Sequence, residues 1–157
     1  MVVILNIILA QIRRIADYQF GAGVGNTLFP DNITIELSKQ GRPRRIYLNN
    51  KLIATVRARD GYIALTLDSA KILLENGLAK KNVVTISEEA VPFIKTGRNV
   101  FAKFVRDVSE DLRAGEEVII VNEKKELIAV GRAILNGEEM RTLKSGLAIK
   151  VRRGVED

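Results

Sequence analysis

EEAVPFIKTGRNVFAKFV, residues 88–105, is the stretch of the sequence that decides the fold. It predicts a short helix between Ser87 and Thr96 that ends at Gly97, followed by an extended segment over residues 99–105. Pro92 is tolerated only near the beginning of a helix, so the helix should begin a residue or two after Ser87.

Short apolar segments surround this stretch and indicate a second domain over residues 81–157. Gly131 interrupts one of them and predicts a bulge or a barrel corner. Several short strands with corner glycines are typical of a small, nearly closed β-barrel. The expected strands are 83–86, 117–122, 126–135 and 147–152, with one or two helical turns over 137–144. The expected core residues are Val84, Ile86, Phe93, Val118, Ile120, Ile128, Val130 and Val151.

The first half, residues 1–78, predicts a small α+β domain. Its first helix, residues 3–17, carries an apolar stripe of Ile4, Ile8, Ile12 and Ile15. Three alternating glycines at 21, 23 and 25 then favour a tight connection over a dinucleotide site, because a helix precedes them. A meander of antiparallel strands follows over 33–37, 44–48, 52–59 and 62–67, with a turn at Asn49-Asn50. A helix over 68–76 should begin at the N-cap Asp68 and end at Gly77.

Composition excludes several classes of enzyme. The 157 residues contain no Cys and no His, which excludes disulfides, thiolate metal sites and Ser-His-Asp triads. The chain is also too short for an eight-stranded α/β barrel, which needs about 250 residues. Ser87, Thr96 and Ser145 have no local base and are interpreted as caps and turns. We expect no catalytic residue, no metal and no cofactor.

The apolar segment at the beginning, Met1–Ala10, is shorter than the roughly 20 residues of a membrane span. It lacks the basic start and the cleavage site of a signal peptide. A packing helix is therefore favoured over a membrane-surface helix. We expect a cytoplasmic protein without a membrane partner.

Positive charge is concentrated in three windows that contain no acid: residues 37–59, 95–106 and 141–153. Together they hold sixteen Lys and Arg residues, whereas the net charge of the whole chain is +6. Segregation of this kind produces a positive face that attracts phosphate polymers. The alternative is a solvated, ion-pair-rich surface of the kind found in thermophiles.

The 88–105 stretch resembles the opening of a PUA domain. The runs LIAVGRA at 127–133, EM at 139–140 and GLAIKVR at 146–152 resemble later parts of the same module. The resemblance implies a mixed β pseudo-barrel that binds RNA, as PUA domains do in pseudouridine synthases and archaeosine transglycosylases.

Residues 16–21, 41–45, 54–57 and 60–67 resemble the domain that precedes PUA in archaeal tRNA-guanine transglycosylases. The catalytic barrel and the cysteine-zinc domain of that family have no counterpart here. The resemblance therefore implies a non-catalytic protein that binds tRNA, near its acceptor stem.

The resemblance and the charge pattern together name the candidate RNA contacts. The PUA resemblance transfers to Gly97, Arg98, Asn99, Lys103, Arg132, Lys150 and Arg152. The basic window of the first half adds Arg42, Arg44, Arg45 and Arg57. A glycine allows close approach of the RNA backbone, although a plain helix stop also explains Gly97.

The aromatic residues divide into two groups. Phe93, Phe101 and Phe104 are expected in the core. Tyr47 lies among arginines and is a candidate for stacking an unpaired base, whereas Tyr18 and Tyr62 are ambiguous.

The leading hypothesis is an RNA-binding protein that contacts tRNA and is associated with tRNA modification. One alternative is a PUA factor associated with the ribosome and translation. Another is a non-catalytic subunit that supplies tRNA binding to a separate transglycosylase-type enzyme. An enzyme with an unrecognised site is the least favoured.

Overall fold

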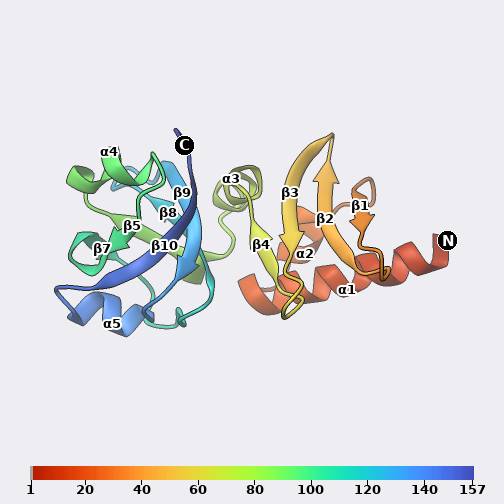
Figure 1. Cartoon of the computed structure of the whole chain (residues 1–157), viewed down its shortest axis with the longest axis horizontal. Helices are drawn as coiled ribbons and strands as arrows, with labels where there is room; N and C mark the ends of the chain where they lie inside the picture. The colour runs from red at the N-terminus through yellow and green to blue at the C-terminus, as the bar shows by residue number, and fades with distance from the viewer. Residues whose placement is uncertain (1) are drawn as a thin grey trace. The chain divides into compact units, whose positions relative to one another are not determined.

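The computed structural model describes residues 2–157, with side chains from residue 5 onward, and divides into two units (Figure 1). The first unit ends at Ala79 and the second begins at Lys80. Within the described residues, none of the helices is long and apolar enough to cross a membrane.

The first unit combines three helices with a four-stranded antiparallel sheet in the order β1-β2-β3-β4. The strands are β1 (Thr34–Leu37), β2 (Pro43–Leu48), β3 (Lys51–Val56) and β4 (Ile63–Leu65), and the helices are α1 (Val2–Phe20), α2 (Val24–Leu28) and α3 (Leu67–Glu75). Ile8 and Ile12 of the predicted stripe are buried and Ile15 is half-buried, whereas the side chain of Ile4 lies outside the described residues. Asn49 and Asn50 adopt φ values of 52° and 67°, as a two-residue hairpin turn requires.

The glycine-rich connection contains the short helix α2, which the sequence did not predict. Gly21 and Gly23 have φ values of 114° and 91°, which other residues adopt only with strain. Gly25 serves a different purpose, because a Cβ there would meet the backbone carbonyl of Arg13 on α1. Its N–H donates to Oδ1 of Asp17 at 2.7 Å. The three glycines therefore turn the chain back and allow α2 to pack closely on α1.

Helix α3 begins at Leu67, one residue earlier than expected. Thr66, and not Asp68, is the N-cap: its hydroxyl accepts from Ser69 N, and Ser69 Oγ accepts from Thr66 N at 2.9 Å. This reciprocal capping satisfies two backbone donors at once, which Asp68 inside the first turn does not. Gly77 follows the helix with a φ of 64°, as predicted for a stop.

The second unit is a nearly closed six-stranded mixed sheet in the order β6-β10-β9-β8-β5-β7. Its strands are β5 (Val83–Ile86), β6 (Val100–Phe101), β7 (Val105–Asp107), β8 (Glu117–Val121), β9 (Leu127–Ala133) and β10 (Leu147–Gly154). Strands β5 and β8 are parallel and the other pairs are antiparallel. The helical segments are η1 (Lys80–Asn82), η2 (Glu88–Ala90), α4 (Val91–Ile94), η3 (Ala102–Phe104) and α5 (Gly137–Thr142).

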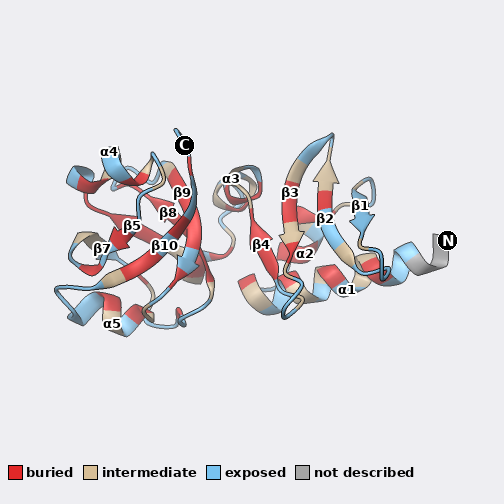
Figure 2. Ribbon diagram, in the orientation of Figure 1, coloured by how far each residue is buried: buried red, intermediate tan, exposed pale blue. Residues whose placement is uncertain are grey.

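The core of this pseudo-barrel contains six of the seven predicted strand residues, and Val130 is buried outside that cluster. Figure 2 colours β5, β8 and β9 mostly as buried. Two aromatic predictions were wrong: Phe93 is 58% exposed and Phe101 is 48% exposed. Helix α4 is a single turn whose core contacts come from Ile94 and Val91, so Phe93 points outward. The expected extended segment 99–105 is interrupted by η3, and Phe104 packs partly buried against the core.

Gly131 lies at an irregularity of the sheet, as predicted. The register of β10 shifts between Val151 and Arg153, opposite Gly131 and Val130. A Cβ on Gly131 would meet the backbone carbonyl of Lys150, so only glycine allows this approach of β9 to β10. The bulge leaves Arg152 outside the regular ladder.

Candidate nucleic-acid interface

The end of α4 forms one part of the predicted interface. Gly97 has a φ of 103° and its N–H donates to the carbonyl of Ile94 at 3.0 Å. This geometry is that of a helix stop. Arg98 follows directly and is exposed.

Two acids cover the same glycine. A Cβ on Gly97 would lie 2.9 Å from Oδ2 of Asp157. Glu156 forms an ion pair with Lys95 at 3.0 Å, and its N–H donates to the carbonyl of Lys95 at 2.8 Å. Gly154 allows this approach, because a Cβ there would meet that same carbonyl. The carboxylate of Asp157 therefore lies where the sequence predicted an RNA backbone, and Glu156 offsets the charge of Lys95 beside it.

The sheet presents a second part, formed by Arg132 and Lys150. These residues are direct cross-strand partners on β9 and β10, and both are exposed. Neither forms an ion pair with any residue that the structure describes. Like charges at directly opposed positions repel, so an anion bound between them would relieve the repulsion. We call Arg98, Arg132 and Lys150 the PUA cation set.

Arg152 has a role inside the protein. Its Nη2 donates to Oε1 of Glu117 at 2.6 Å and its Nη1 donates to Oε2 at 3.2 Å. The side chain of Glu117 is only 1% exposed. The guanidinium therefore neutralises a buried carboxylate, and the bulge of β10 directs it there.

Two further predicted contacts also have partners within the fold. Oδ1 of Asn99 accepts from Val151 N at 2.9 Å, which fixes the segment before β6 to β10. Lys103 is exposed, and its Nζ lies 5.0 Å from the centroid of the Phe104 ring. Lys103 thus remains at the surface beside an aromatic face.

The first unit gathers most of the predicted arginines around an open groove with a volume of 630 Å³. Arg42, Arg44 and Arg57 line it, together with Arg59, which the sequence analysis did not select. Its apolar lining comes from Ile12, Ile15, Pro43 and Val56. Asp60 lines the groove as well and pairs with Arg57 at 3.5 Å. We call this the arginine groove.

Arg45 does not belong to the groove. Alternation along β2 directs neighbouring side chains to opposite faces of the sheet. Arg45 accordingly pairs with Glu36 on β1 at 2.8 Å, whereas Arg44 lines the groove. The charge of Arg45 is thus offset by its partner.

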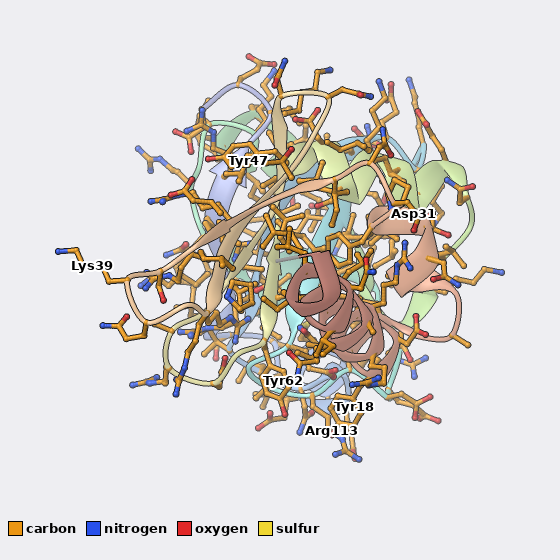
Figure 3. All side chains as sticks on the ribbon, turned by 90° about the vertical axis from the view of Figure 1, so that its right-hand side faces the viewer. Tyr18, Asp31, Lys39, Tyr47, Tyr62 and Arg113 are labelled. Carbon is orange, nitrogen blue, oxygen red and sulfur yellow. The ribbon has the colours of Figure 1, made fainter. Side chains whose placement is uncertain are left out.

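The three tyrosines have different surroundings. The hydroxyl of Tyr47 donates to Glu36 at 3.3 Å, beside Arg45. Tyr18 and Tyr62 instead stack on each other, with ring centroids 6.3 Å apart and an interplanar angle of 14°. Figure 3 shows these two side chains next to each other and well away from Tyr47. They come from distant parts of the chain, so no local pattern in the sequence could have paired them.

Each half of the chain matches the model of a known domain family. The model of the patch-forming domain C2 of tRNA-guanine transglycosylase matches residues 10–77, and that of the PUA domain matches residues 82–155. The second unit belongs to the PUA family, and the chain is a PUA-domain protein.

More particularly, the chain resembles the C-terminal domains of archaeal tRNA-guanine transglycosylases. It is 44% identical over 149 residues to the tRNA-guanine(15) transglycosylase of Methanobrevibacter smithii, covering 94% of this chain and 23% of that protein. It is 47% identical over 146 residues to that of Thermococcus onnurineus, covering 92% of this chain and 25% of that protein. The chain thus spans about a quarter of the length of these relatives.

Two solved structures share the fold along nearly the whole chain. A hypothetical protein from Pyrococcus horikoshii OT3 superposes with a TM-score of 0.76 at 22% identity, covering 96% of this chain and 91% of that one. A conserved PUA domain protein from Thermoplasma acidophilum superposes with a TM-score of 0.67 at 20% identity, covering 95% of this chain and 91% of that one. These similarities concern the fold.

Proposed function

We propose that this protein binds RNA, specifically tRNA, and acts in tRNA modification without catalysing it. The matched domains support RNA binding associated with tRNA modification. The observation that carries the proposal is the exposed pair Arg132 and Lys150 of a PUA domain, two opposed cations that form no ion pair among the described residues. Glu117, the cross-strand neighbour of Arg132 on β8, pairs instead with Arg152. Phosphate oxygens are the ligands that such a pair accepts.

The proposed contacts lie in two domains, 1–78 and 81–157. In the second, they are the PUA cation set, the backbone at Gly97 and the side chain of Lys103. In the first, they are Arg42, Arg44, Arg57 and Arg59 of the arginine groove. We expect smaller contributions from the contacts that already have a partner within the protein, which are Asn99, Arg45, Arg57 and Arg152.

A second candidate function is that of a tRNA-binding subunit for a separate catalytic chain. The observation in its favour is that the chain corresponds to about a quarter of each transglycosylase that it matches. Such a subunit would hold the tRNA while the partner carries out the chemistry.

Crosslinking in cells followed by sequencing of the bound RNA tests the proposed function. We expect tRNA to dominate the recovered sequences, with crosslinks in the acceptor stem. A transglycosylase that copurifies with the protein would support the subunit role. Recovery of ribosomal RNA in place of tRNA would contradict the proposal and favour a factor associated with translation.

The acids over Gly97 yield a prediction about affinity. Glu156→Gln with Asp157→Asn should strengthen tRNA binding about 2- to 30-fold at 0.1 M salt, since each exposed charge interaction is worth about 0.2–1 kcal/mol. The gain should shrink as salt screens the charges. Fluorescence anisotropy with labelled tRNA measures both effects.

Glu110→Gln with Asp111→Asn is the matched control, because it removes the same charge at another surface. Glu110 lies beside Arg141 of α5, and Figure 1 shows α5 and α4 on opposite sides of this unit. An equal gain from both double variants would show that net charge alone matters. No gain from the first variant would place the RNA away from Gly97.

A further inference from the structure

The arginine groove has a chemical character of its own. Its apolar surface comes from α1 and β3, through Ile12, Ile15 and Val56. Arg42 and Arg44 lie just before and just inside the beginning of β2, and Arg57 and Arg59 come from the turn after β3. The groove therefore combines a surface that can contact a sugar or a base with several guanidinium groups that can bind phosphate.

The stacked tyrosines continue from the same two elements. Tyr18 lies three residues after Ile15 on α1, so the two side chains share one side of the helix. Tyr62 follows Gly61 directly, and Gly61 lines the groove. The tyrosine pair therefore comes from the same two parts of the chain as the groove, although neither ring is part of the groove lining itself.

Hydrogen bonds hold the backbone beside both tyrosines. Gln19 makes two hydrogen bonds with the backbone of Ile63: its Nε2 donates to the carbonyl at 3.0 Å, and its Oε1 accepts from the N–H at 2.7 Å. Asp60 Oδ1 accepts from Tyr62 N at 2.9 Å. These bonds hold the backbone next to Tyr18 and Tyr62 in place, and the two rings stack on that fixed backbone.

Exposure distinguishes this pair from ordinary packing. Tyr18 is 77% exposed and Tyr62 is 39% exposed, although both are aromatic. One ring stacks on the other, and the outer face of Tyr18 remains open to solvent. A third flat ring can extend the stack.

We propose that the arginine groove and the Tyr18–Tyr62 pair form a binding site for an unpaired segment of RNA. The guanidinium groups bind consecutive phosphates, and one base stacks on Tyr18. This inference rests on the proposed RNA binding and adds that the first domain recognises single-stranded RNA.

The chemistry favours an unpaired segment over other ligands. Bases within a duplex are already stacked on their neighbours and cannot extend a stack on a protein ring. An acidic peptide would satisfy the arginines but would leave the open face of Tyr18 unused. Single-stranded RNA provides both the phosphates and the exposed base faces.

The test compares a labelled ten-nucleotide uridine oligomer with a labelled blunt-ended RNA duplex of ten base pairs, using the full chain. Tyr18→Ala should weaken binding of the oligomer about 5- to 100-fold and leave duplex binding within about twofold, because stacking on an aromatic ring strengthens binding of single strands. Tyr18→Phe keeps the ring and should bind the oligomer nearly as well as the wild type. Tyr47→Ala is the matched tyrosine control and should have little effect, with folding checked by circular dichroism.

Neighbouring arginines provide a second comparison. Arg44→Ala should make the salt dependence of oligomer binding shallower by about 0.7 in log–log slope, the value for one phosphate contact on a single strand. Arg45→Ala should leave the slope unchanged, because Arg45 pairs with Glu36 on the opposite face. Arg44 and Arg45 are adjacent in the sequence, but their side chains lie on opposite faces of the sheet.

The outcomes separate this inference from the proposed function. An unchanged oligomer affinity in Tyr18→Ala, or an equal loss with the duplex, would overturn the inference while tRNA binding by the wild type still supports the proposed function. A wild-type protein that binds neither oligomer, duplex nor tRNA would overturn both.

Discussion

Arg152→Ala should lower the free energy of unfolding by about 3 kcal/mol, because it removes the guanidinium that pairs with a buried carboxylate. Glu117 is 1% exposed and receives two hydrogen bonds from Arg152, at 2.6 and 3.2 Å. Breaking a buried pair costs more than the pair contributes, since the remaining charge stays away from water. Urea unfolding followed by circular dichroism measures the change.

Two further variants make this experiment specific. Lys150→Ala, two positions earlier on the same strand, should change stability by no more than about 0.5 kcal/mol, because the side chain is exposed. Combining Glu117→Gln with Arg152→Ala should recover part of the loss, since no buried charge remains. If Arg152→Ala were as stable as Lys150→Ala, Arg152 would instead be available for RNA, as the sequence predicted.

Replacing the whole PUA cation set, Arg98, Arg132 and Lys150, with alanine should weaken tRNA binding severely. Each phosphate contact contributes about 0.7–0.9 to the log–log salt slope. Lowering the salt from 1 M to 0.1 M therefore raises the affinity by about 100- to 500-fold through three such contacts, and the triple variant loses that gain. The slope should become shallower by about 2 to 3. Stability should change little, because all three side chains are exposed.

A control variant separates this surface from net charge. Lys80, Arg113 and Lys124 are also exposed, and they lie outside β9, β10 and the end of α4. Replacing these three with alanine removes the same charge and should weaken tRNA binding only slightly. Equal losses in the two triple variants would mean that the RNA is held by diffuse charge and not by the PUA cation set.

Local patterns were enough to predict the elements whose causes are local. The strand Val83–Ile86 consists of β-branched residues, which favour strands, and the Asn49-Asn50 turn suits two residues with positive φ. The cap of α3 was missed because Thr66 and Asp68 are both good N-caps two positions apart, and only the reciprocal bonds with Ser69 favour Thr66. Helix α2 was missed because glycines predict a loop, even where one of them permits close helix packing.

Contacts between distant residues explain the remaining differences. The exposed Phe93 lies on a single helical turn, which is too short for apolar periodicity to indicate a face. The sequence predicted RNA contacts at Arg152 and Arg45, but Glu117 and Glu36 lie opposite them only in the folded sheets. Conversely, the acid-free window 37–59 did contain the arginines of the groove, because neighbouring strands of a meander bring them together.

The salt dependence of tRNA binding tests the central claim, that this PUA-domain protein binds RNA through phosphate contacts. Affinity of the wild-type chain for a transcribed tRNA is measured by fluorescence anisotropy between about 0.05 and 0.4 M salt. With about six phosphate contacts from the two domains, the log–log slope should be about −4 to −5. A slope near zero, or no binding at low salt, would contradict the account.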